Sequence, residues 1–126
     1  MTTRSSAVKW LAIAAILGTG AIHALEAQDA FGDAAYKGVL FAANGAGALV
    51  AAFGLYRNRR ALGWLLGLLV AGGALLAYVA SRTVGLPMLP AEPDEWLEPM
   101  GVASLVCEGL FLILFVIAQR ARRRGR

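Results

Sequence analysis

The sequence predicts an all-α membrane protein, an antiparallel bundle of four transmembrane helices that forms a single domain over residues 1–126. Two observations predict this fold. Apolar residues make up 59% of the chain and charged residues only 16%, a balance far from that of a soluble domain of this size. Four runs of about 20 residues also lack nearly all charge, and this length crosses a hydrocarbon core of about 30 Å. The runs cover residues 7–27, 36–56, 61–81 and 100–119. A soluble four-helix bundle is the alternative, but its helices would each carry a polar face.

The charges lie on two opposite sides of this predicted bundle, and they predict its orientation. Basic residues lie at the start of the first run (Arg4 and Lys9), fill the turn 57–60 and form the tail 120–126. The acids gather in the other connections, from Glu26 to Asp33 and in the loop 82–99. Basic residues near helix ends stay cytoplasmic, so we expect a multi-pass membrane protein with both termini in the cytoplasm. The basic tail then faces anionic lipid headgroups, and the expected partner is the lipid bilayer rather than nucleic acid.

The first run has the charge pattern of a secretion signal but lacks a cleavage site. His23 and Glu26 occupy the places where small residues would be needed, so an uncleaved first helix is the better interpretation. Thr19, His23 and Glu26 fall at i, i+4 and i+7, on a single helical stripe. Residues 28–33 are predicted to form a polar turn at the outer surface, with Gly32 as the residue that breaks the helix.

The second and third runs carry small residues at every fourth position, which lets helix backbones approach closely. These ridges are Ala43, Gly47 and Ala51 in the second run, and Gly63, Gly67 and Ala71 in the third. Packing within the chain is the favoured interpretation, and packing against a second copy is the alternative.

Four prolines prevent a continuous helix between the third and fourth runs. Trp96 lies among the acids of this loop, where it could anchor in the headgroups or present a docking surface to a partner. The single Cys107 lies within the fourth run and excludes an intramolecular disulfide, so it is expected to be a small buried thiol.

A few polar side chains interrupt the apolar runs, and all of them fall in the outer half of the predicted bundle. With the outer helix ends level, a rise of about 1.5 Å per residue puts Asn44 and Glu108 roughly 12 Å deep and His23 and Tyr78 roughly 6–7 Å deep. Side chains lean toward the N-terminus of their own helix, so those on alternate helices lean toward one another. The predicted polar cluster is His23, Asn44, Tyr78, Arg82, Ser104 and Glu108.

This cluster has a structural and a functional interpretation. In the structural one, Arg82 neutralises Glu108 and the others complete a hydrogen-bonded plug, because unpaired polar groups are costly in a membrane. In the functional one, His23 and Glu108 bind a proton or a small ligand. A metal site would have only His23 with Glu26 or Glu108, and a haem would have one axial histidine. No metal or cofactor is therefore expected.

Two segments carry a resemblance to known sequences. They are Ser81-Arg82-Thr83-Val84-Gly85-Leu86-Pro87 and the stretch from Glu98-Pro99-Met100-Gly101 to Glu108. The chain resembles small four-helix membrane proteins of high-GC bacteria that carry no assigned function, and Gly38–Asn44 and His23 are similar to theirs as well. The resemblance implies the fold and the location, and it implies no activity.

The function expected from the sequence is that of an accessory or binding subunit of a larger membrane assembly. The alternative is a small proton-coupled carrier or ligand-binding protein that uses His23 and Glu108, and a carrier of four helices would need to form a homo-oligomer. No nucleophile–base pair, phosphate-binding loop or metal motif occurs in the sequence, so no enzymatic activity is predicted.

Overall fold

Helices account for nearly all of the chain in a computed structural model that describes residues 3–125. The elements are α1 (Thr3–Asp33), α2 (Ala35–Tyr56), the π-helical turn η1 (Ala61–Leu65), α3 (Leu66–Thr83), the 3₁₀ turn η2 (Pro93–Glu95) and α4 (Pro99–Arg124). Four helical segments are long and apolar enough to cross a membrane, with η1 and α3 counted as one segment, Ala61–Thr83. The described residues thus have the helices that a small polytopic membrane protein requires.

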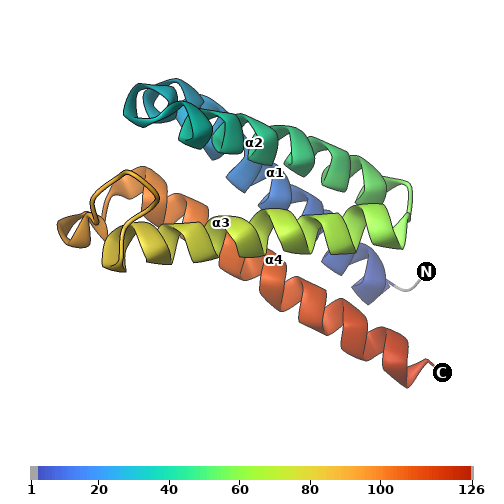
Figure 1. The fold of residues 1–126 in the computed structure, drawn as a ribbon. Coiled ribbons are helices and arrows are strands. Elements are labelled where there is room, and N and C mark those ends of the chain that lie inside the picture. Colours follow the sequence, from blue (N-terminus) through green and yellow to red (C-terminus); the bar gives the residue numbers. More distant parts are fainter. Residues whose placement is uncertain (1–2, 126) are drawn as a thin grey trace.

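The chain connections lie at two opposite ends of the bundle (Figure 1). At one end, which we call the basic end, are the start of α1, the turn 57–60 and the end of α4. At the other, the acidic end, are the α1–α2 connection and the loop 84–98. The charge separation in the sequence therefore corresponds to a separation in space.

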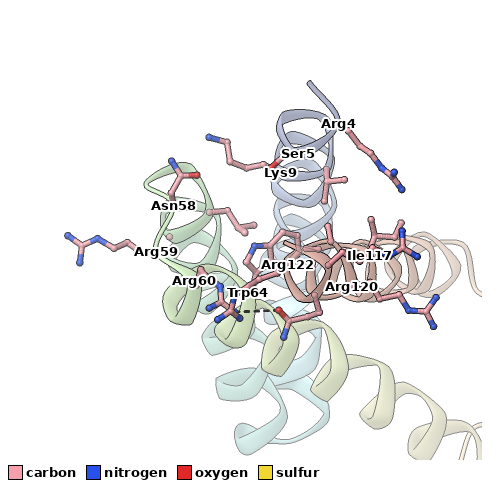
Figure 2. A pocket seen from close by; sticks show the side chains of 17 residues that line it. Arg4, Ser5, Lys9, Asn58, Arg59, Arg60, Trp64, Ile117, Arg120 and Arg122 are labelled. Atoms are coloured by element: carbon pink, nitrogen blue, oxygen red, sulfur yellow. Dashed lines mark hydrogen bonds between the residues drawn. The ribbon is translucent and has the colours of Figure 1, made fainter. Parts of the chain in front are cut away.

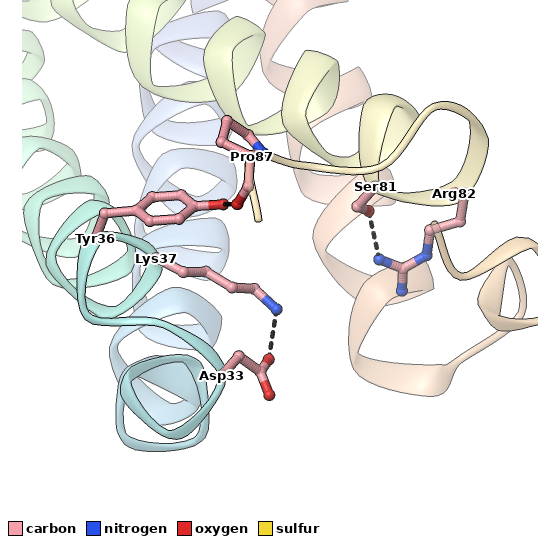
Figure 3. Close-up of polar contacts among 6 residues, drawn as sticks. All are labelled: Asp33, Tyr36, Lys37, Ser81, Arg82 and Pro87. Atoms are coloured by element: carbon pink, nitrogen blue, oxygen red, sulfur yellow. Dashed lines mark hydrogen bonds and ion pairs between the residues drawn. The ribbon is translucent and has the colours of Figure 1, made fainter. Parts of the chain in front are cut away.

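The helix α1 is longer than the sequence predicted, and the polar turn expected at 28–33 is wrong. The helix continues through Gly32 to Asp33, and only Ala34, with an extended backbone, separates it from α2. Two contacts support this sharp connection. Lys37 forms an ion pair of 2.7 Å with Asp33, as Figure 3 shows, and the Phe31 ring packs directly on Gly38. These contacts offset the roughly 1 kcal/mol that a glycine costs inside a helix.

Small residues set the closest helix approaches, but not all of them are those predicted. At the α1–α2 contact, a Cβ added to Gly45 would lie 3.3 Å from the Gly20 carbonyl oxygen and 3.4 Å from the Ala24 methyl group. The predicted ridge on α2 is displaced from this contact, because Ala43 is exposed and Gly47 faces Val70 of α3. On η1 and α3 the predicted ridge is buried: Gly63 packs on α2, and Gly67 packs on Phe111 of α4.

The apolar core lies mainly toward the basic end. Its largest fully buried apolar side chains are Ile16 and Phe111, and the Trp64 ring lies 5.6 Å from the Phe111 ring, centroid to centroid. Large apolar side chains are exposed on every long helix, among them Leu25, Leu49, Leu69 and Ile113. An exposed surface of this kind suits lipid better than water.

The loop 84–98 is held in place by specific contacts rather than left open. Tyr36 of α2 donates a hydrogen bond to the Pro87 carbonyl (Figure 3). Gly85 has φ +87°, a conformation that side chains disfavour. Glu98 caps α4 by accepting from the backbone N–H groups of Met100 and Gly101, at 3.1 and 2.6 Å. The fourth helix therefore has a defined start at Pro99.

Candidate functional site

The carboxyl group of Glu108 lies inside the bundle, with 1% of the residue exposed. Its Oε2 accepts two hydrogen bonds from hydroxyl groups. Thr19 Oγ1 of α1 donates one at 2.6 Å, and Ser104 Oγ, one turn earlier on α4, donates the other. Thr19 is fully buried as well. The two hydroxyl groups lie 3.2 Å apart, so the three side chains form one compact group that joins α1 to α4.

His23 extends this group toward the acidic end. It lies one turn after Thr19 on the same face of α1. Its Nδ1 is 2.7 Å from the Thr19 carbonyl oxygen and 3.3 Å from Thr19 Oγ1. A carbonyl oxygen can only accept, so Nδ1 carries the hydrogen in this arrangement. The ring packs edge-on against Phe41 of α2, 5.0 Å between centroids. We call Thr19, His23, Ser104 and Glu108 the polar centre.

The predicted pairing of Arg82 with Glu108 is wrong. Within residues 3–125, the one ion pair is Lys37 with Asp33. Arg82 instead donates 2.8 Å to Ser81 Oγ, drawn in Figure 3, and 3.2–3.3 Å to the Glu95 carbonyl. The reason is its place in the last turn of α3, from which a long side chain reaches the polar loop more easily than the bundle interior.

Tyr78 belongs with Arg82 rather than with the polar centre. The Arg82 guanidinium stacks on the Tyr78 ring at 4.0 Å. The Tyr78 hydroxyl donates 2.7 Å to the Trp96 carbonyl, and the two aromatic rings meet edge to face. Gly101 of α4 leaves room for the Tyr78 ring, because a Cβ there would lie 2.6 Å from it. These residues fasten the loop 84–98 to α3.

Asn44 is also separate from the polar centre. Its Nδ2 donates 3.1 Å to the Val70 carbonyl and so joins α2 to α3. Its Oδ1 is buried and has no hydrogen-bond partner among the described residues. Of the six residues that the sequence grouped, the structure thus brings together His23, Ser104 and Glu108.

Thr19 is the member that the sequence reasoning left out. Its position one turn before His23 on a common stripe was the available signal. What could not be read from the sequence is that this stripe faces the Ser104–Glu108 face of α4. A threonine hydroxyl inside a helix usually bonds to its own backbone, so its long-range role needed the structure.

The polar centre can hold a proton or form hydrogen bonds, but it lacks the ligands of a metal site. In the part of the chain that the structure describes, no three His, Cys, Asp or Glu side chains are placed to hold a metal ion. Cys107 is partly buried and lies against Gly18 of α1. Its thiol therefore contributes to helix packing.

These features are compatible with one class of protein, a small polytopic membrane protein with a carboxyl group buried between two helices. Comparisons with protein-family models, with curated proteins and with solved structures find no match to this chain. Its function must therefore be argued from the geometry.

Proposed function

We propose that the chain is a multi-pass protein of a bacterial inner membrane, an antiparallel bundle with both termini in the cytoplasm. The separation of a basic end from an acidic end supports this orientation, because basic residues flanking helices remain on the cytoplasmic side. The Arg-over-Lys usage and the abundance of Ala and Gly are typical of a high-GC bacterial source. In this orientation, His23 lies between Glu108 and the outer surface.

Within this topology, the polar centre acts as a proton-binding site, with Glu108 as the group that takes up and releases the proton. The observation that carries this proposal is a buried carboxyl group that receives two hydroxyl donors and no basic side chain among the described residues. An ionised carboxylate buried without a cation is costly, and ionisable groups in membrane spans mark proton and ligand sites.

The neighbouring side chains supply a route for that proton. Thr19 Oγ1 lies between Glu108 Oε2 at 2.6 Å and His23 Nδ1 at 3.3 Å. A hydroxyl group can accept a proton from the imidazolium form of His23 while it gives its own to the carboxylate, which leaves a neutral imidazole and a carboxylic acid, and can then rotate back. An imidazole ring can take up and release a proton. His23 is partly exposed, so it can act as the exchange point between solvent and the buried carboxyl group.

Infrared spectroscopy on the reconstituted protein tests this proposal directly. The carbonyl band of a protonated carboxylic acid should appear and disappear as the bulk pH is changed. It should be absent in Glu108→Gln and retained in the control Glu92→Gln, which removes an exposed loop carboxylate. His23→Gln should slow the exchange and leave the band itself in place. A band that does not respond to pH in the wild-type protein would show that Glu108 serves packing alone.

Proton uptake by vesicles adds a functional measurement. Wild-type protein should carry protons down an imposed gradient into vesicles that enclose a pH-sensitive dye, whereas Glu108→Gln should reduce the rate to that of protein-free vesicles. Equal rates for the wild type and Glu108→Gln would rule out Glu108 as the carrier group. A titrating infrared band without proton flux would restrict the function to proton binding.

An accessory or binding role is the second candidate, and the loop 84–98 favours it. Three of its apolar side chains are almost fully exposed, with Val84 at 86%, Met88 at 93% and Leu97 at 85%. The contacts of Arg82, Tyr78 and Tyr36 hold this surface in one shape, and a preorganised apolar surface suits a protein partner.

Purification from native membranes in a mild detergent tests this role. The wild-type protein should co-migrate with a larger membrane complex, and Met88→Ser/Leu97→Ser should be released from it. Leu69→Ser, on the exposed face of α3, is the control and should remain bound. A chain that migrates alone or as a homo-oligomer would contradict the accessory role.

A further inference from the structure

A large pocket opens at the basic end of the bundle, far along the helices from the polar centre. Its volume is about 770 Å³, within the range of small-molecule sites. Figure 2 shows that its lining comes from the start of α1, the turn before η1, η1 itself and the last turns of α4. Segments from both halves of the chain thus form one cavity.

The pocket is strongly basic. Seven of its 17 lining residues are Arg or Lys, and none is Asp or Glu. The hydrogen bond drawn in Figure 2 runs from Arg60 Nη2 to Gln119 Oε1, a neutral acceptor, at 3.4 Å. The one ion pair of the described residues lies at the acidic end. The cations of this pocket are therefore gathered around a cavity without carboxylate partners in residues 3–125.

The same pocket has an apolar wall. Val8, Leu55, Trp64 and Ile117 line it together with the basic side chains. Leu55 belongs to the apolar core, and the other three pack against that core. A ligand that fits both parts has an anionic head and a hydrocarbon tail. A free anion would contact the basic part and leave the apolar wall unused.

We propose that this pocket binds an anionic phospholipid from the surrounding membrane. The guanidinium groups hold the phosphate, since arginine binds phosphate oxygens in bidentate geometry. One acyl chain lies along Trp64 and Ile117. Basic pockets between transmembrane helices at the cytoplasmic side bind anionic headgroups in this way. This inference does not depend on the role of Glu108.

The indole of Trp64 allows a direct test, because bromine atoms on an acyl chain quench tryptophan fluorescence at short range. The protein would carry Trp10→Phe and Trp96→Phe, so that Trp64 is the only tryptophan, and would be reconstituted into phosphatidylcholine vesicles. Brominated phosphatidylglycerol should quench Trp64 more strongly than brominated phosphatidylcholine at the same mole fraction. Equal quenching by the two lipids would overturn the proposal.

Matched arginine variants separate the pocket from diffuse surface charge. Arg60→Gln/Arg122→Gln removes two lining charges, whereas Arg57→Gln/Arg123→Gln removes two charges from the same segments that do not line the pocket. The loss of one hydrogen bond to a charged phosphate corresponds to roughly a tenfold change in binding. Because diffuse attraction falls equally in both variants, the lining variant should bind phosphatidylglycerol at least about tenfold more weakly than the control. Equal losses in the two variants would show diffuse attraction only and overturn the proposal.

Two further measurements complete the test. Glycerol phosphate, which has the headgroup but no acyl chain, should not displace brominated phosphatidylglycerol, and displacement would indicate a site for free phosphate instead. Native mass spectrometry of the otherwise unmodified chain should detect retained phosphatidylglycerol, which Arg60→Gln/Arg122→Gln should lose. This measurement does not require the two tryptophan substitutions, and an absence of retained anionic lipid would contradict the proposal.

Discussion

Replacing Gly67 with alanine should destabilise the bundle, although alanine is the better helix former. A Cβ at Gly67 would lie 2.9 and 3.0 Å from Cε1 and Cε2 of Phe111, and closer still to Cζ. The Phe111 ring is fully buried and packs at a tilt of 39° against the Trp64 ring, so it cannot turn away into open space. The α3–α4 contact would have to open or the ring would have to leave its rotamer.

Two opposing effects determine the expected change in the free energy of unfolding. Overpacking a core site costs about 1–3 kcal/mol, and replacing glycine with alanine inside a helix contributes about 1 kcal/mol in the other direction. Gly73→Ala is the matched control, because it lies on the same helix and its added Cβ meets nothing within 4 Å. Gly67→Ala should therefore be about 1–3 kcal/mol less stable than Gly73→Ala.

Circular dichroism of both variants during unfolding in detergent would measure this difference. The double variant Gly67→Ala/Phe111→Leu should recover part of the loss, since the smaller side chain makes room for the new methyl group. Gly67→Leu should be the least stable of the series. If Gly67→Ala proves as stable as Gly73→Ala, the close contact between α3 and α4 is not as described.

The polar centre, the position of Arg82 and the topology each have a direct test. Thr19→Val should lower the free energy of unfolding by about 1 kcal/mol, the usual value of a hydrogen bond between membrane helices, whereas the exposed Thr83→Val should change it by less than about 0.5 kcal/mol. Arg82→Met and Glu108→Met should act independently, because the two side chains share no contact, and their effects should add within about 0.5 kcal/mol. Recovery of stability in the double variant would instead indicate a pair. Reporter fusions should place the C-terminus inside and Asp94 outside, and an externally accessible C-terminus would contradict the orientation.

The helical segments could be predicted from the sequence because length and apolarity decide them. Four apolar runs of about 20 residues predict four helices able to span a membrane, and the structure has them. Their contact faces could not be predicted in the same way. These helices are apolar on most sides, so no polar face marks the outer surface, and the contact between α1 and α2 is set by Gly20, Gly45 and Ala48. Ala43, for example, was predicted to lie on a helix contact, but it is exposed in the structure.

The sequence indicates how far along the bundle each candidate residue lies, but it does not indicate the side of the helix on which that residue lies. Counting residues from the helix ends gives the height of a side chain, and His23 and Glu108, which this count put in the outer half of the bundle, both contact Thr19 in the structure. The same count placed Asn44 beside Glu108, although Asn44 faces α3. The height of a residue does not determine which neighbouring helix its side chain faces, because that depends on how the helices pack.

The buried face of α4 also determines from which side a proton could reach Glu108. Gly101, Ser104, Glu108, Phe111 and Leu114 follow one another along this face. The hydroxyl groups and His23 adjoin Glu108 toward the acidic end, whereas the fully buried Phe111 ring, packed on Gly67, adjoins it toward the basic end. Any route toward the basic end would have to displace that ring from a core in which small shifts are costly. In the proposed proton-binding role, exchange between Glu108 and solvent would therefore run through Thr19 and His23, and a carrier cycle would require α3 and α4 to separate at Phe111.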